Sequence, residues 1–381
     1  MRSEYLITLD THCRTSDACV KTACGKLVRR QCLPTSIPTL REFIRQVPRP
    51  RRLCFEEGPL AGWLYRNLRE EVEELVVSDP RRNAYVGKDG DKDDPIDAEK
   101  LNDLYRGNLI RPVHQSASAE RAGFKQLVGA YHAAVRGRVR QTNRLLALGK
   151  RWGLMWTSSS LLAGDAAEAL AASLRQAGAS ADVELIAELL RNGLNQAAEA
   201  EESLARRLRE LARASELMRR LMEVPGYGAI RVTTLVAYWD TPWRFHGREA
   251  LWKYCGIGLR RQHSGGGPEY VSVEQACNRT LRGVVLGAAQ RAIRVAASAK
   301  APDPQEMQDP DSYQRSDHET VNVFAERYAR WLKAGLSPHN ARRNVARLMS
   351  QCLWSMWKSG ESFNPARLSL KPPDDQGTDR C

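Results

Sequence analysis

A long stretch without any strand pattern most constrains how this chain can fold. Residues 117–223 are rich in Ala, Leu, Arg and Glu, which are good helix formers. Positions in its second half follow alternating steps of four and three residues: Leu190, Leu194, Ala197, Glu201, Leu204, Leu208, Leu211, Ser215, Met218 and Met222. This heptad seam predicts a coiled coil or a long helical hairpin, and it favours a homo-oligomer, either a dimer or a tetramer. The alternative is an ordinary amphipathic helix that packs on its own domain.

The segment before this helical region alternates between strand and helix patterns. Strands are expected at 5–9, 52–55 and 75–77, extended stretches on both sides of a turn at Gly25, and helices at 37–47, 60–73 and 96–105. Strands that alternate with helices predict an α/β domain whose sheet contains parallel pairs.

The segment after the helical region is predicted to be mostly α-helical, with glycine-rich breaks. Within it, residues 301–316 are rich in Pro, Asp and Gln, and we expect a flexible insertion there. The polar end of the chain is expected to be disordered. We therefore divide the chain into an α/β domain (1–115), a helical region (116–223), a mostly helical domain (224–360) and a tail (361–381).

The net charge indicates the class of partner. Lys and Arg number 58 against 45 Asp and Glu, a formal charge of +13, which favours a polyanion such as nucleic acid over the alternative of a merely soluble basic protein. The nine cysteines lack the paired spacing of a zinc site and are expected to be reduced thiols of a cytosolic protein. We expect no signal peptide, and the longest apolar runs, such as 283–289, are too short for a membrane span of about 20 residues.

Four carboxylates are candidates for a metal site. Asp10 ends the first expected strand, Glu56 follows the strand at 52–55, and Asp94 and Asp97 lie three residues apart at the start of a helix. Carboxylates that converge on a sheet edge and a neighbouring helix suit Mg²⁺, a hard cation that binds phosphate substrates.

Each of these carboxylates also has a purely structural interpretation. Asp94, followed by a proline and then by Asp97, makes a good helix start, and Asp10 alone could be a turn residue. Glu57 could take the place of Glu56.

A turn with the sequence Pro-Gly-x-Gly, from Pro225 through Gly226 to Gly228, precedes an apolar helix. This is the pattern of a helix-hairpin-helix motif, whose free backbone amides bind a DNA phosphate without reading sequence. The alternative is an ordinary connection between two helices.

Two further segments could contact a nucleic-acid backbone. Ser264 lies between the basic pair Arg260 and Arg261 and three glycines; it is a candidate nucleophile or a structural turn residue. The stretch 327–347, which includes Arg342 and Arg343, contains six cations and no acid, so it forms either a nucleic-acid-binding face or a solvated helix face.

In this order, the motifs resemble those of the insertion-sequence 110 family of transposases, which are related to the Piv DNA invertases. Asp10 and Glu56 look like the first two carboxylates of the family, and Lys92, Asp94, Asp97 and Ala98 match its Lys-x-Asp-x-x-Asp-Ala pattern. The hairpin at 225–228, the segment 254–258 and Ser264 match the second family domain in sequence order. The residues after Ser264 lack the usual basic side chains of the family, which leaves Ser272 as an alternative.

The resemblance implies an N-terminal RuvC-like domain of the ribonuclease-H type. Its DEDD tetrad, here Asp10, Glu56, Asp94 and Asp97, would bind Mg²⁺, and Ser264 would attack a DNA phosphate. The implied activity is transposition, with donor and target DNA as partners in the nucleoid of a prokaryotic cytoplasm. Some members are guided by a structured RNA, and the net charge is compatible with such a partner. A metal-dependent junction nuclease and a non-catalytic nucleic-acid-binding protein are the alternatives.

Overall fold

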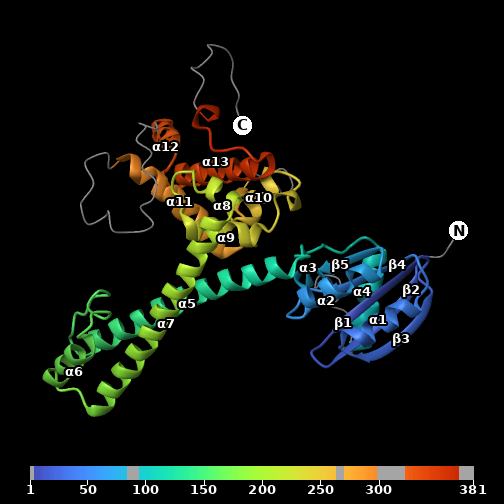
Figure 1. The fold of residues 1–381 in the computed structure, drawn as a ribbon, viewed down its shortest axis with the longest axis horizontal. Helices are drawn as coiled ribbons and strands as arrows, with labels where there is room; N and C mark the ends of the chain where they lie inside the picture. The colour runs from blue at the N-terminus through green and yellow to red at the C-terminus, as the bar shows by residue number, and fades with distance from the viewer. Residues whose placement is uncertain (1–3, 84–93, 263–269, 298–321, 369–381) are drawn as a thin grey trace, which may run out of the picture. The chain divides into compact units, whose positions relative to one another are not determined.

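The structure is a computed structural model that describes residues 4–83, 94–262, 270–297 and 322–368 (Figure 1). The chain forms two compact units, Met1–Gly123 and Phe124–Cys381. The insertion expected at 301–316 and residues 369–381 of the expected tail lie outside the described residues. The first residues of that tail, 361–368, are described, and Phe363 stacks on Phe324 with ring centroids 5.9 Å apart. The domain boundaries expected at 115/116, 223/224 and 360/361 stay predictions. Within the described ranges, no helix is long and apolar enough to cross a membrane.

A five-stranded mixed sheet forms the first unit, with the strand order β3-β2-β1-β4-β5. The pairs β1–β2 and β2–β3 are antiparallel, whereas β4 lies parallel to both β1 and β5. The parallel pairs confirm the predicted α/β class, and the sheet is consistent with a ribonuclease-H-like fold. The strands are β1 (Tyr5–Thr11), β2 (Thr15–Thr22), β3 (Leu27–Pro34), β4 (Arg51–Glu56) and β5 (Glu74–Ser78).

One face of the sheet packs against α1 (Ile37–Gln46) and α2 (Ala61–Leu68), both drawn in blue in Figure 1. Ile7, Leu9 and Phe55 belong to this core and are completely buried. Because side chains alternate along a strand, the residues between them must point to the other face.

The other face is covered by α4 (Asp94–Arg106). Leu6 and Cys54, which alternate with the residues of the first core, pack there against Leu101 and Tyr105 of α4. The remaining elements of this unit are the short helices η1 (Arg69–Glu71) and α3 (Pro80–Asn83). The unit is therefore a sheet between two helical layers.

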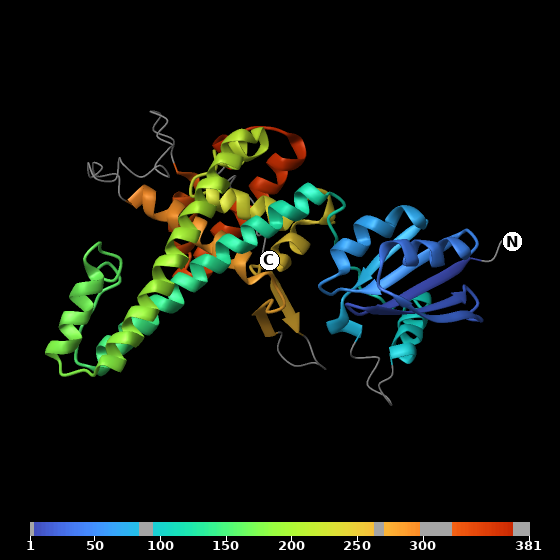
Figure 2. The same ribbon diagram turned by 60° about the horizontal axis from the view of Figure 1, so that its bottom comes forward.

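The second unit contains two long helices that run side by side, α5 (Ala119–Arg151) and α7 (Ala181–Ala214), which Figure 2 shows in teal to yellow-green. Leu145 of α5 and Leu194 of α7 share one buried cluster, which α6 (Ala166–Gln176) also enters. The heptad position Leu194 therefore packs within this chain, and the coiled coil and the oligomer stay predictions.

The predicted seam does not continue through one helix. Helix α7 ends at Ala214, and α8 (Glu216–Leu221) begins after Ser215, whose side chain accepts a hydrogen bond from the Met218 amide at 3.3 Å. Ser215 is one of the two polar interruptions of the seam. Serine favours a helix N-cap because its hydroxyl accepts a hydrogen bond from an otherwise unpaired backbone amide. The helix therefore ends at Ser215 for a local reason, although the heptad pattern continues.

The rest of the second unit is a helical bundle around one large core. Trp239, Phe324, Met349 and Leu353 are completely buried in it. The elements are α9 (Ala229–Trp239), η2 (Pro242–Arg244), α10 (Arg248–Tyr254), the hairpin β6 (Leu259–Gln262) and β7 (Tyr270–Val273), α11 (Arg279–Ala297), α12 (Val323–Lys333), α13 (Pro338–Ser359) and η5 (Pro365–Arg367). Helix α13 is well delimited, since Ser337 caps its start and Gly360, with φ of 72°, ends it in the left-handed region.

Candidate functional site

Strand register places Asp10 beside Glu56. Leu9 of β1 and Phe55 of β4 are partners in the parallel pair, so the next residues, Asp10 and Glu56, lie at the same level on adjacent strands. Asp10 lies four residues after Leu6, and Glu56 lies two residues after Cys54. Because side chains alternate along a strand, Asp10 and Glu56 belong to the same face as Leu6 and Cys54, which face α4. The ends of β1 and β4 thus bring two of the predicted carboxylates to one face of the sheet.

The same alternation distinguishes Glu56 from Glu57. Glu56 is the last residue of β4 and continues the series that faces α4. Glu57 is exposed, and its amide donates a hydrogen bond of 2.9 Å to the carbonyl of Ser78. Glu57 lies after the end of β4 and outside the series that faces α4, which supports Glu56 as the carboxylate of the site.

Asp17 is a further carboxylate at this position that the sequence analysis missed. In the antiparallel pair of β1 and β2, Asp17 lies directly opposite Asp10, and such partners share one face of the sheet. His12 Nε2 lies 3.3 Å from Asp10 Oδ2. Asp17 can be identified only from the pairing register of β1 and β2, which depends on its distance along the chain from the turn that follows β1. The strand pattern alone does not give this register.

Hydrogen bonds orient α4 against β1. The Thr8 hydroxyl donates to the carbonyl of Ala98 at 2.7 Å, and the Asn102 amide nitrogen donates to the carbonyl of Leu6 at 2.9 Å. All four residues are buried. Helix α4 therefore runs antiparallel to β1, with its N-terminus toward the end of that strand.

This direction brings the first turn of α4 to the level of Asp10. From Thr8 to Asp10 the strand advances by about 6.6 Å, and from Ala98 back to Asp94 the helix retreats by about 6 Å. The backbone of Asp94–Asp97 thus lies at the carboxylate end of the sheet face. Asp97 is exposed there, and the side chain of Asp94 lies outside the described residues.

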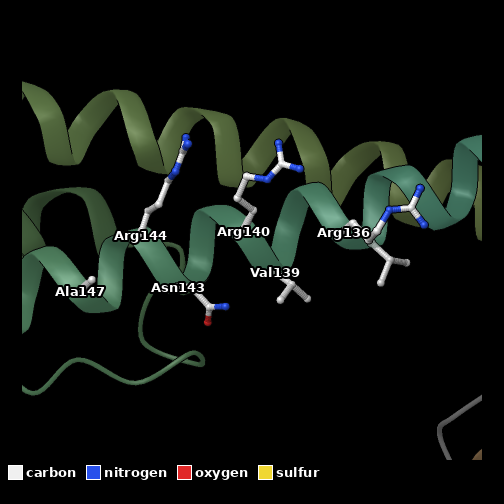
Figure 3. Close-up of a pocket in the computed structure, with 7 residues that line it drawn as sticks. Arg136, Val139, Arg140, Asn143, Arg144 and Ala147 are labelled. Carbon is white, nitrogen blue, oxygen red and sulfur yellow. The ribbon is translucent and has the colours of Figure 1, made fainter. Parts of the chain in front are cut away.

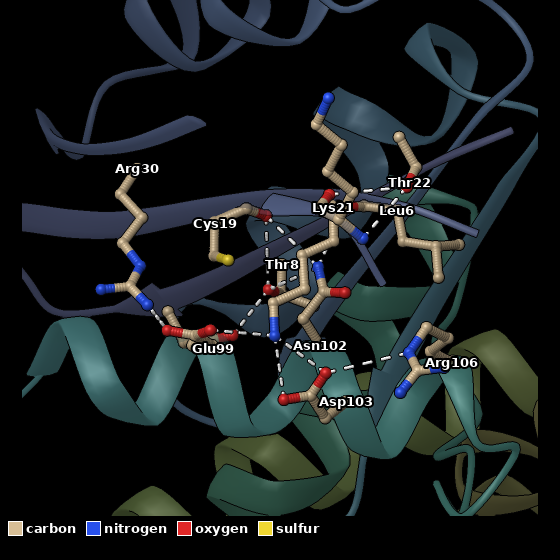
Figure 4. Close-up of polar contacts among 12 residues, drawn as sticks. Leu6, Thr8, Cys19, Lys21, Thr22, Arg30, Glu99, Asn102, Asp103 and Arg106 are labelled. Carbon is tan, nitrogen blue, oxygen red and sulfur yellow. Dashed lines mark hydrogen bonds and ion pairs between the residues drawn. The ribbon is translucent and has the colours of Figure 1, made fainter. Parts of the chain in front are cut away.

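A network of ion pairs holds the same helix to β2 and β3 (Figure 4). Lys21 is only 5% exposed, and its Nζ lies 2.8 Å from Asp103 and 3.0 Å from Glu99. Arg30 also pairs with Glu99. Removing the carboxylate partners of a buried ammonium group strongly destabilises the folded protein. This network therefore fixes the position of the helix that carries Asp94 and Asp97. No local sequence pattern predicted this network, because the partners lie far apart in the chain.

Cys54, two residues before Glu56 on the same face, is not a competing nucleophile. Burial raises the pKa of its thiol, and the negative charge of Glu56 raises it further. A thiol with a raised pKa stays protonated and reacts poorly.

The oxygen donors at this end of the sheet fit a hard divalent cation. Among the described residues, no three His, Cys, Asp or Glu side chains already lie close enough together to hold a metal ion. The group that the backbone assembles, however, consists of the carboxylates Asp10, Asp17, Glu56 and Asp97, and carboxylate oxygens are the ligands that Mg²⁺ takes from proteins.

In the second unit, the turn at Pro225–Gly228 connects α8 to α9, as the sequence predicted. Gly226 has φ of 86°, and a Cβ built on it would lie 2.4 Å from the carbonyl oxygen of Ala288 in α11. The Gly226 carbonyl also accepts a hydrogen bond of 2.8 Å from Arg231. The requirement for glycine at 226 is thus explained by packing and backbone conformation, and the role of the turn in DNA binding stays a prediction.

The serine segment is described only at its two ends. Ser264 lies outside the described residues, between β6 and β7, and so does the side chain of Arg261. Arg260 is exposed and lies directly opposite the half-buried Ser272 in the antiparallel pair. The alternative serine therefore shares a face of the hairpin with one of the predicted cations.

Arg342 and Arg343 lie in the first turns of α13 and have neutral partners. Arg342 donates to Gln290 at 2.9 Å, and Arg343 donates to Asn340 at 2.9 Å. The two ring nitrogens of His339 lie 3.2 Å from Arg342 and 2.7 Å from Arg343.

A third arginine adds to this positive cluster. The charges of Arg343, Arg342 and Arg282 lower the pKa of His339, with a contribution from desolvation. Desolvation, together with Arg282 and Arg342, also lowers the pKa of Arg343. A field that disfavours further positive charge is a favourable environment for an anion such as a phosphate.

Two family models match parts of the chain. A model described as "Transposase", which represents DEDD transposases of insertion-sequence 110, matches residues 7–150. A model described as "Transposase IS116/IS110/IS902 family" matches residues 218–303. No curated protein matches the chain significantly. The first match contains all four predicted tetrad carboxylates, and the second contains the Pro-Gly-x-Gly turn, Arg260, Arg261 and Ser264.

Proposed function

Because this chain belongs to the insertion-sequence 110 family of transposases, we propose that it cuts and rejoins DNA with a carboxylate-held Mg²⁺ and a serine nucleophile. The observation that carries the proposal is the register of β1 and β4, which brings Asp10 and Glu56 side by side on the face that α4 covers. The first turn of α4 is proposed to supply Asp94 and Asp97. These four residues form the proposed tetrad.

The tetrad would hold Mg²⁺ where strands and helix converge. When bound, the ion stabilises the negative charge that develops on a phosphate during its attack. The network around Lys21 and the bond from Thr8 to Ala98 keep the helix at a fixed position relative to the sheet. A rigid ligand set is required because Mg²⁺ tolerates little deviation from octahedral geometry.

The proposed nucleophile is Ser264. Its Oγ loses its proton and forms a bond to phosphorus while one phosphate ester bond of the DNA backbone breaks, and the released deoxyribose oxygen takes up a proton in exchange. The phosphoserine ester keeps the energy of the broken bond for rejoining. Arg260, Arg261 and the cluster of Arg342 and Arg343 are proposed to position the backbone, since guanidinium groups bind phosphate through paired hydrogen bonds.

The proposed partners are donor and target DNA, with the backbone amides of Gly226 and Gly228, in the turn that begins at Pro225, as a further phosphate contact. A guide RNA and a homo-oligomer are also part of the proposal. The net charge of +13 supports DNA and RNA as partners, and the heptad pattern before Ser215 supports the oligomer.

The test is denaturing electrophoresis of the protein incubated with labelled donor DNA and Mg²⁺. We expect a covalent protein–DNA adduct that Ser264→Ala abolishes, while Ser272→Ala still forms it. A turn serine tolerates alanine with a change of less than about 0.5 kcal/mol in unfolding free energy, so loss of the adduct in a folded variant identifies the nucleophile. Free nicked DNA without an adduct would favour the metal-dependent nuclease, and an adduct lost only in Ser272→Ala would transfer the role to that residue.

A further inference from the structure

A row of arginines occupies one exposed face of α5. Arg136, Arg140 and Arg144 are spaced four residues apart, and Figure 3 shows their side chains extending to the same side of the helix. Val139, which is 45% exposed, and Asn143 project from the adjoining face. The row lies on a shallow surface depression of the second unit.

The long helices α5 and α7 differ strongly in charge. Helix α5 contains eight Lys and Arg residues, and Glu120 is its only acid. Helix α7 instead contains seven Asp and Glu and five Arg. The positive charge of the pair is therefore concentrated on α5.

The arginine row does not serve to hold the two helices together. The ion pair that joins them uses a different residue of α5, since Arg138 Nε lies 2.6 Å from Glu201. Other acids of α7 pair elsewhere: Glu184 with Arg175, and Glu210 with Arg207. Within the described part of the chain, Arg136, Arg140 and Arg144 form no salt bridge.

Three aligned and exposed cations that form no salt bridge within the described residues are available to bind an anionic partner. We propose that Arg136, Arg140 and Arg144, on an element of the chain that carries neither the proposed carboxylates nor the proposed serine, bind the sugar–phosphate backbone of duplex DNA. The inference rests on the action of the chain on DNA, but not on the assignment of the tetrad or of Ser264.

The dimensions of the row agree with this partner. Each step of four residues advances by about 6 Å, so the row covers about 12 Å of the helix. Along about 12 Å of a duplex, one strand presents roughly three phosphates. Contacts between arginine and phosphate fix position without reading sequence, and they are suited to the DNA that flanks an exchange site.

The test measures the affinity of the full-length protein for a labelled duplex of random sequence as a function of salt concentration. We expect Arg140→Gln with Arg144→Gln to weaken binding by about tenfold at 0.1 M salt. The slope of log K against log salt should also fall by about 1.8, because each phosphate contact contributes about 0.9. Thermal unfolding should match the parent, since both side chains are exposed.

A matched control removes the same charge from the other helix. Arg206 and Arg213 are exposed residues of α7, and their double substitution by Gln should leave the affinity within about twofold of the parent. Equal losses in both double variants would overturn the proposal, because total charge alone would then explain binding.

Other outcomes assign the surface to another partner and also overturn the proposal. One is unchanged affinity for the duplex with weakened binding of structured RNA. Another is unchanged binding of DNA while the molar mass of the protein, measured by light scattering, differs from that of the parent. Since the assay measures binding and not the covalent adduct, its result does not depend on whether the proposed chemistry is correct.

Discussion

At the scale of single residues, the pairing register of β1 with β2 and β4 brings Asp10, Asp17 and Glu56 to the face of the sheet that α4 covers. The strand pattern predicted Asp10 and Glu56 at strand ends but did not exclude Glu57 as the second carboxylate. The alternation of Cys54 and Phe55 between the two cores supports Glu56. Asp17 was missed because its position opposite Asp10 depends on how the chain turns between β1 and β2.

Asp17 provides a prediction at this scale. Removing one negative charge beside Asp10 weakens the attraction for a divalent cation, whose affinity depends on the charge of its ligands. We expect Asp17→Asn to raise the Mg²⁺ concentration for half-maximal activity by about tenfold. The same titration with Asp182→Asn, at an exposed position of α7, is the control. An unchanged Mg²⁺ requirement for Asp17→Asn would place Asp17 outside the metal site.

Gly226 provides a second prediction, which separates a steric clash from backbone strain. Gly226 and Gly178 both have positive φ, 86° and 79°, but a Cβ at 178 would meet open space. Left-handed backbone costs a non-glycine residue about 1–2 kcal/mol, so Gly178→Ala should lose about that much unfolding free energy. Gly226→Ala should lose at least about 2 kcal/mol more because of its contact with Ala288. Urea unfolding compares the two, and equal losses would contradict the packing explanation.

At the scale of elements, the strands and helices were largely predictable and the attachment of α4 was not. Local periodicity indicated strands near β1, β4 and β5 and helices near α1, α2 and α4. The contacts that hold α4, from Thr8 to Ala98 and from Lys21 to Asp103, join residues more than 80 positions apart. No local pattern contains such a pairing, because it forms only when the sheet has folded.

The bond from Thr8 to Ala98 can be tested by a substitution that keeps its shape. Thr8→Val removes the hydroxyl and leaves the buried carbonyl without this donor, which costs about 1–3 kcal/mol of unfolding free energy. Thr15→Val, at the exposed start of β2, should cost much less. Denaturant unfolding measures both, and similar losses would show that the Thr8 bond does not stabilise the docking of α4.

The contact between α5 and α9 should make stability depend on pH. His132 Nε2 lies 2.9 Å from the Thr234 hydroxyl, and burial, followed by the charge of Arg136, lowers the pKa of His132 below 6.5. Its contribution to stability is therefore present above pH 6.5 and is lost as pH falls through the lowered pKa. We expect the His132→Gln variant to lose less unfolding free energy than the parent as pH falls below 6.5. An unchanged pH profile would contradict this role.

At the scale of the whole molecule, the chain combines an α/β unit that carries the proposed carboxylates with a helical unit that carries the proposed serine segment. The α/β class was predictable because strands alternate with helices, and the large helical core was predictable in class but not in packing. The heptad pattern was misleading about continuity, since Ser215 ends one helix and starts the next.

The most direct test of the central claim compares two neighbouring glutamates in Mg²⁺-dependent formation of recombinant DNA. Glu56→Gln removes a proposed ligand, whereas Glu57→Gln changes an exposed residue by the same chemistry. We expect Glu56→Gln to lower product formation at least about 100-fold and Glu57→Gln to stay within about threefold of the parent. Product formation that survives in Glu56→Gln, or that is lost in Glu57→Gln alone, would show that Glu56 is not a ligand of the metal site.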